Sequence, residues 1–168
     1  MVLTKSELVA SLQNEVRILL HLASKVDRSM LDYRPAPRQR STIELLRYLV
    51  VMGPELIKAA KAGNFDSSSW KAATDATDCL DFDQVIAAIA MQRDVYAELV
   101  GSIGDDDFRT PITMFTGATT RGKFIVDLVV AGCAAYRTQL FIYLKACGHE
   151  ELGTMNLWGG VDPPPKST

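Results

Sequence analysis

Four segments of this chain carry apolar residues at three- and four-residue steps, the spacing that gives an α-helix one apolar face. They span residues 4–26, 41–63, 81–101 and 120–147. The first three segments begin with Thr, Ser or Asp followed three residues later by Glu or Gln, the signature of a capping box. Four such helices predict an all-α fold, a four-helix bundle with a long crossover between the third and fourth helices.

The connections between these helices differ in composition. Residues 27–40 contain two prolines and cannot be helical throughout, and Pro54 should kink the second helix. Residues 64–79 are rich in Ser, Thr and Asp, which indicates a surface excursion. Residues 110–117 of the crossover favour a short extended piece or a small hairpin, and residues 149–168 predict an irregular tail.

The size and charge of the chain restrict its function. Its 168 residues are the length of one domain, 1–168. Lys and Arg number 18 against 20 Asp and Glu, a net charge of -2 that does not favour nucleic acid as a partner. We expect no membrane span, because the longest nearly apolar run, residues 124–136, is shorter than the roughly 20 residues that a bilayer needs. Three cysteines without a CxxC pair, and no visible signal peptide, predict a cytoplasmic protein with reduced thiols.

Two segments carry a resemblance to a known family. Residues 31–49, LDYRPAPRQRSTIELLRYL, and residues 135–144, AYRTQLFIYL, resemble the second-helix and fourth-helix segments of the DinB-like proteins. The resemblance covers roughly residues 5–150. It implies a bundle that binds a divalent metal, usually nickel or zinc, through one histidine of the second helix and two histidines, four residues apart, of the fourth. Some members of that family are thiol-dependent transferases or isomerases, and some are hydrolases.

This sequence departs from the family at all three ligand positions. The family's histidines correspond here to Tyr48, Gly132 and Tyr136. The chain has only two histidines: His21 should face solvent, and His149 follows the end of the fourth helix. We therefore expect no metal, no cofactor and no catalytic residue at these positions, which form either ordinary core or a small pocket. The residues expected near such a pocket are Glu44, Met52 and Gln139.

Other clusters have ordinary explanations beside functional ones. Arg34, Arg38 and Arg40 could clamp a phosphate or carboxylate, or could cover one end of the bundle and pair with carboxylates. Residues 105–107 are three consecutive Asp, and a solvated loop is favoured there over a calcium site because their side chains point in different directions. Cys133 and Cys147 lie about 21 Å apart along one helix and cannot share a metal ion.

Three functions remain open at this point. The replaced histidines favour a metal-free, non-catalytic module that binds a small ligand or another protein. The alternative is a metal- or thiol-dependent transferase or hydrolase that uses a repurposed site. The third is a structural role through a homodimer, which we expect because the fourth helix has apolar residues outside the stripe that contains Gly132 and Tyr136. Those residues are Ile125, Val129, Phe141 and Ile142.

Overall fold

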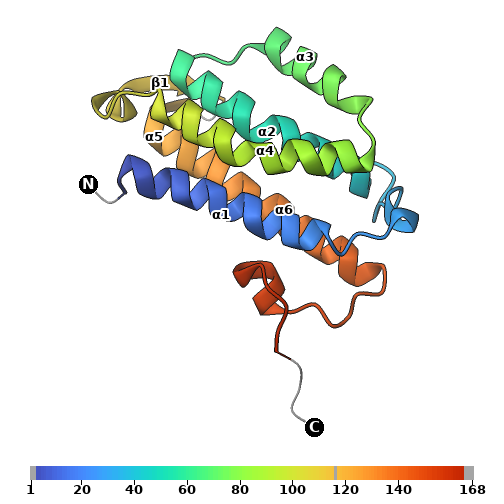
Figure 1. Cartoon of the computed structure of the whole chain (residues 1–168). Helices are drawn as coiled ribbons and strands as arrows, with labels where there is room; N and C mark the ends of the chain where they lie inside the picture. The colour runs from blue at the N-terminus through green and yellow to red at the C-terminus, as the bar shows by residue number, and fades with distance from the viewer. Residues whose placement is uncertain (1–2, 116, 165–168) are drawn as a thin grey trace.

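Four long helices form a bundle in this computed structural model, which describes residues 3–115 and 117–164. They are α1 (Lys5–Ala23), α2 (Thr42–Ala62), α4 (Phe82–Gly101) and a continuous helix of residues 121–146. This last helix, here called the fourth bundle helix, consists of α5 (Arg121–Phe124), the π-turn η3 (Ile125–Val130) and α6 (Ala131–Ala146). Both α1 and α2 pack against α4 and against α6 (Figure 1). The predicted all-α bundle is confirmed.

Shorter elements connect the bundle helices. The single-turn helices η1 (Arg28–Met30) and η2 (Asp106–Arg109) lie in the first connection and in the crossover. Of the two conformations expected for residues 110–117, the hairpin forms, but it extends to Thr120: β1 (Pro111–Met114) pairs antiparallel with β2 (Gly117–Thr120), with Met114 opposite Gly117. Thr116 lies outside the described residues.

The three capping boxes form as the sequence predicts. Thr4, Ser41 and Asp81 each accept a hydrogen bond from the backbone N–H three residues later, and the Glu or Gln there accepts one in return. At the other end of α2, Gly63 adopts φ of 80°, a left-handed conformation in which glycine is not strained. These local signals explain why the bounds of the long helices follow closely from sequence.

Pro54 lies inside α2, and the neighbouring helix α4 compensates for it. A proline has no N–H, so the Val50 carbonyl one turn earlier loses its usual helix partner. The side chain of Gln92, which is 4% exposed, donates from Nε2 to the carbonyl oxygens of Val50 and Leu49, both at 2.9 Å. One amide group therefore satisfies the interrupted part of α2 and joins it to α4.

Replacing Gln92 with leucine is expected to lower the free energy of unfolding by about 1–3 kcal/mol, because buried carbonyl oxygens lose their donor. The matched control is Gln13→Leu, which removes an exposed hydrogen bond to the Arg93 carbonyl and should change stability by less than about 0.5 kcal/mol. Urea denaturation measures both values. Equal losses in the two variants would show that Gln92 does not support the interrupted helix.

Residues 64–79 lie at the surface, as predicted, but most of this segment is a helix that the sequence analysis did not predict. α3 (Ser67–Asp78) lies outside the bundle against α2 (Figure 1). Asp66 caps it by accepting from the N–H groups of Ser68 and Ser69, and the Ser69 hydroxyl donates to Glu55 of α2 at 2.9 Å. Its polar composition concealed the helix, since Thr77 is its only buried residue.

The core-facing side of the fourth bundle helix also differs from the prediction. Ile125 and Val129, which were expected to lie outside the stripe of Gly132 and Tyr136, are fully buried, whereas Ile142 is 58% exposed. At about 100° per residue Ile125 lies only about 20° from Gly132 and from Tyr136 around the helix, so the expectation had misplaced it. Two of the four residues behind the expected homodimer therefore belong to the monomer's own core. The homodimer stays a prediction, which light scattering would contradict by finding only a species of 18.4 kDa.

The fourth bundle helix is long and apolar enough to cross a membrane by length and composition alone. It has 26 residues, and an 18-residue window of it has a mean hydropathy of 1.4. The sequence expectation considered only the shorter uninterrupted apolar run. Within the structure this helix packs against α1 and α2 and forms an ion pair with α1 through Arg137, which is how a bundle helix packs.

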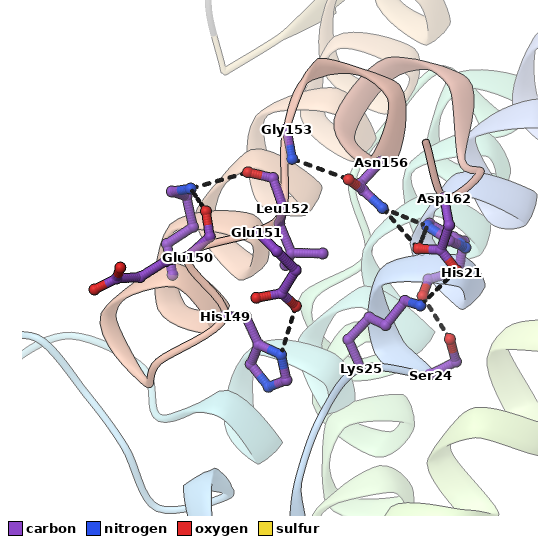
Figure 2. Close-up of polar contacts among 11 residues, drawn as sticks. His21, Ser24, Lys25, His149, Glu150, Glu151, Leu152, Gly153, Asn156 and Asp162 are labelled. Atoms are coloured by element: carbon purple, nitrogen blue, oxygen red, sulfur yellow. Dashed lines mark hydrogen bonds and ion pairs between the residues drawn. The ribbon is translucent and has the colours of Figure 1, made fainter. Parts of the chain in front are cut away.

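The tail is not wholly irregular, and His21 does not face solvent. The tail contains the π-turn η4 (Met155–Gly159), which packs on α1. Asn156 is 1% exposed: its Nδ2 lies 3.2 Å from His21 Nε2 and donates to Asp162 at 2.9 Å (Figure 2). The tail therefore covers His21, a long-range contact that helix periodicity does not reveal. Residues 165–168 of the predicted tail lie outside the described residues.

The His21→Gln variant is expected to make stability less dependent on pH between about pH 7 and pH 5. Burial lowers the pKa of His21, and the Asp162 carboxylate opposes this effect. A histidine with a lowered folded-state pKa stabilises the fold above its unfolded pKa, and that contribution is lost as the pH falls through the folded pKa. Urea denaturation of both proteins at the two pH values tests this, and an unchanged pH dependence would contradict it.

Candidate functional site

A groove of about 550 Å³ lies beside α2 and the fourth bundle helix. The three positions that the family resemblance matches to metal ligands, Tyr48, Gly132 and Tyr136, all line it, together with Met52. The other lining residues are Leu56, Phe65, Trp70, Phe115, Asp127, Leu128, Ala131 and Ala135. The structure thus brings together residues of α2, α3, the fourth bundle helix, the loop after α2 and the turn of the hairpin.

Aromatic rings form a continuous series of contacts around this groove. In order, they belong to Tyr136, Tyr48, Trp70, Phe65, Phe115 and Phe124. Neighbouring ring centroids are 4.9, 6.1, 5.5, 5.0 and 6.1 Å apart. We call this series the aromatic arc. Both of its ends belong to the fourth bundle helix, about 18 Å apart along the helix axis. The arc and the helix therefore surround the groove.

The floor of the groove depends on a residue without a side chain. A Cβ atom added to Gly132 would lie 3.2 Å from the terminal methyl group of Met52 and 3.4 Å from its sulfur. Glycine at this position, with Ala131 and Ala135 beside it, leaves open the space between the fourth bundle helix and α2. A large side chain at residue 132 would fill that space.

Tyr48 separates this groove from a second hollow of about 350 Å³. Its ring contacts Tyr136, and the guanidinium carbon of Arg40, which lines the second hollow, lies 3.8 Å from the centroid of the Tyr48 ring. Burial raises the pKa of Tyr48, so its phenol is neutral at physiological pH. Tyr48 is therefore suited to ring packing and to neutral hydrogen bonding, and not to acting as an anionic ligand.

Glu44 and Gln139 do not line the groove. Glu44 caps α2 through the Ser41 N–H at 2.8 Å and pairs with Arg34 at 3.1 Å, and the capping bond is the main cause that lowers its pKa. Gln139 donates to the Tyr143 hydroxyl at 2.5 Å. Both side chains are therefore engaged in holding the fold, although each lies within one turn of a groove residue in sequence.

The charged clusters noted in the sequence have structural partners. Arg34 pairs with Glu44 while Arg40 stacks on Tyr48, so these two arginines face different groups. In the acidic run, Asp105 pairs with Lys5 at 2.9 Å and Asp107 pairs with Arg121 at 3.4 Å. These four side chains therefore point to four different partners.

The groove does not fit the metal that the family resemblance implies. Metal ligands must be deprotonated, and Tyr48 is held in its neutral form while Gly132 offers no side chain. Cys133 is buried in the core beside Tyr96, and burial raises its pKa to about 12, so its thiol stays protonated. Among residues 3–115 and 117–164, no group of three or more His, Cys, Asp or Glu side chains is placed to hold a metal ion.

Several groove residues were not expected from sequence. Phe65, Trp70 and Phe115 lie in polar or irregular segments, where helix periodicity assigns them no face. The available signal was the presence of isolated large aromatic residues in segments that otherwise read as exposed. Asp127 lies within the nearly apolar run 124–136, where the sequence assigns it no role.

The comparisons with known proteins find a structure with a similar fold but no match by sequence. No protein-family model matches the sequence, and no curated protein matches it. The structure is similar to that of a DinB-like protein, YjoA from Bacillus subtilis, with a TM-score of 0.67 and 18% sequence identity. The match covers 88% of this chain and 95% of the other. An identity this low shows a shared fold and transfers neither a ligand nor an activity. The chain therefore has a DinB-like fold.

Proposed function

We propose that this protein is a metal-free binding module whose groove takes a small, largely apolar ligand. One observation supports the proposal: Tyr48, Gly132 and Tyr136, which the family resemblance matches to metal ligands, together line an aromatic groove. Its volume of about 550 Å³ is typical of small-molecule sites, which are mostly apolar with a few polar groups.

The groove favours binding over chemistry. Catalysis by acid and base needs a titratable group with a pKa near neutrality that reaches the substrate. The raised pKa of Tyr48 keeps its phenol protonated at neutral pH, and Asp127 lies at a water-exposed edge of the groove, with its side chain 48% exposed. A thiol-dependent transferase would also need a group that activates the thiol. Among the described residues that line the groove, these side chains offer no such group.

The apolar lining sets the expected affinity. Burying about 200 Å² of ligand surface contributes about 5 kcal/mol at about 25 cal/mol per Å². That free energy corresponds to a dissociation constant of about 0.2 mM before the cost of association is counted. Titrations with simple probes must therefore reach millimolar concentrations.

The fluorescence of Trp70 tests the proposal directly. The chain has two tryptophans, and Trp158→Phe removes the one in the tail while it keeps a ring near Arg137. Titration of this single-tryptophan protein with phenylpropanol, a neutral aromatic probe, is expected to change the Trp70 emission saturably. Gly132→Leu in the same background should abolish the change by filling the floor.

Gly101→Leu is the matched control, because a Cβ atom at Gly101 meets nothing within 4 Å and lies outside the groove. It should leave the titration unchanged. A linear, unsaturable response, or a response that survives Gly132→Leu, would overturn the proposed function.

Elemental analysis provides a further prediction. Purified, tag-free protein is expected to contain no stoichiometric nickel, zinc or iron, because the family's three imidazole positions carry Tyr48, Gly132 and Tyr136. Near-stoichiometric transition metal that resists dialysis would contradict this prediction and would favour the repurposed enzyme.

A further inference from the structure

Asp127 is the one charged residue among the described residues that line the groove. It lies in the π-turn of the fourth bundle helix, and its side chain is 48% exposed. The remainder of the lining is aromatic or aliphatic. A ligand in the groove therefore meets one negative charge, and that charge lies at an edge that water reaches.

The partner of Asp127 is easily displaced. Lys123 lies four residues earlier on the same helix, and its side chain is 65% exposed. Exposed pairs with this spacing contribute only about 0.3–0.5 kcal/mol. A cation delivered by a bound ligand can therefore replace the lysine at Asp127 at little cost, while Lys123 returns to solvent.

The aromatic arc also favours positive charge. The faces of Trp, Tyr and Phe rings carry negative potential and attract cations within about 6 Å. The protein itself uses this property at one ring of the arc, where Arg40 stacks on the side of Tyr48 that faces the second hollow. The groove combines five of the arc's rings with a carboxylate, and both features attract the same sign of charge.

An anionic ligand fits less well. The arginines that would attract it, Arg40 and Arg47, line the second hollow beyond Tyr48 and Trp70. Arg47 is also engaged, because it donates to the Leu80 carbonyl at 3.0 and 2.5 Å. Inside the groove an anion would instead face Asp127, which repels it.

We propose that the groove selects organic ammonium ions, with the apolar part of the ligand against the aromatic arc and the charged nitrogen beside Asp127. This inference rests on the proposed function, since it names the class of ligand for the same groove. Binding of apolar molecules alone would not depend on charge. This proposal requires in addition that the affinity depend on the charge of the ligand and on the carboxylate of Asp127.

Three probes with the same apolar part, a phenyl ring and three methylene groups, test this selection: phenylpropylamine, phenylpropanol and 4-phenylbutanoate. In the Trp158→Phe protein we expect the amine to bind about three- to fivefold more tightly than the alcohol, and the carboxylate to bind most weakly. The advantage of the amine should shrink as salt is added, because Asp127 is partly exposed. Trp70 emission gives the affinities, and titration calorimetry repeats them without relying on fluorescence quenching.

Two variants at the groove edge complete the test. Asp127→Asn should reduce amine binding to the level of the alcohol and leave alcohol binding unchanged. Lys123→Met, which removes the competing cation, should instead strengthen amine binding. If these substitutions only distorted the edge of the groove, they would change the affinities for the alcohol and for the amine equally.

The outcomes separate the two proposals. If none of the three probes binds, the proposed function fails and the ammonium selectivity fails with it. If the alcohol binds and the amine binds no more tightly, or if Asp127→Asn affects both equally, the groove stands and the selectivity is overturned. Tightest binding by the carboxylate probe would also overturn the ammonium selectivity. It would indicate that the arginines beyond Tyr48 determine which ligand binds.

Discussion

Replacing Arg137 with methionine is expected to lower the free energy of unfolding by about 3–5 kcal/mol, the usual cost of leaving a buried charge without its partner. The Arg137 side chain is 3% exposed, and its Nε lies 2.6 Å from Glu15 of α1, which is itself 11% exposed. Its Nη1 also donates to the Leu157 carbonyl of the tail, and its guanidinium lies 4.9 Å from the Trp158 ring. Methionine would leave Glu15 charged, buried and unpaired.

The measurement is urea denaturation, with Trp158 emission as a local readout of the tail. Arg17→Met is the matched control, because Arg17 also holds the tail, through the Gly160 carbonyl at 3.2 Å, but lies at an exposed position. It should cost less than about 1 kcal/mol. The double variant Glu15→Met with Arg137→Met should recover most of the loss, since two apolar side chains leave no buried charge. A double variant as unstable as Arg137→Met would contradict this account.

The parts of the fold that were predicted correctly depend on contacts within a few residues. Ser41 and Glu44 specify the start of α2, and Gly63 specifies its end, without reference to the rest of the chain. The apolar stripes then require the long helices to pack together, and four helices have few ways to do so. The same reasoning placed the hairpin, where Pro111 and Gly117 begin the two strands.

The parts that were missed depend on contacts between distant segments. α3 is held by Asp66 and by the Ser69–Glu55 hydrogen bond rather than by an apolar stripe. The tail is fixed by Asn156, whose partners include His21, 135 residues away in sequence. Periodicity describes one helix at a time and cannot indicate such contacts.

The candidate site divides in the same way. Family resemblance pointed to Tyr48, Gly132 and Tyr136, and the structure places all three on one groove. The far wall comes from Trp70 and Phe115, on α3 and the hairpin, whose positions follow only from the folded chain. Sequence therefore located the helix faces involved, while the shape and aromatic character of the groove required the structure.

If these three positions correspond to the family's ligands, as the resemblance implies, a second large effect follows. Replacing Tyr48, Gly132 and Tyr136 together with histidine is expected to create a site for zinc or nickel. Residues 132 and 136 lie one turn apart on α6, and the Tyr136 ring lies 4.9 Å from that of Tyr48. A Cβ atom at 132 meets only the flexible end of Met52, which can move aside. Three neutral imidazoles then face a common point, with a fourth position open.

Differential scanning fluorimetry measures the gain. At a zinc concentration of 100 times the dissociation constant, binding adds about 2.7 kcal/mol, which raises the Tm of a chain of this size by roughly 5–10 °C. The double variant Tyr48→His with Tyr136→His is the control: it supplies two ligands and keeps Gly132, so its shift should be much smaller, and a chelator should reverse both. The unaltered protein should show no shift. If the triple variant folds but zinc and nickel do not stabilise it, these positions do not correspond to the family's ligands. The groove would then be unrelated to the family's metal site.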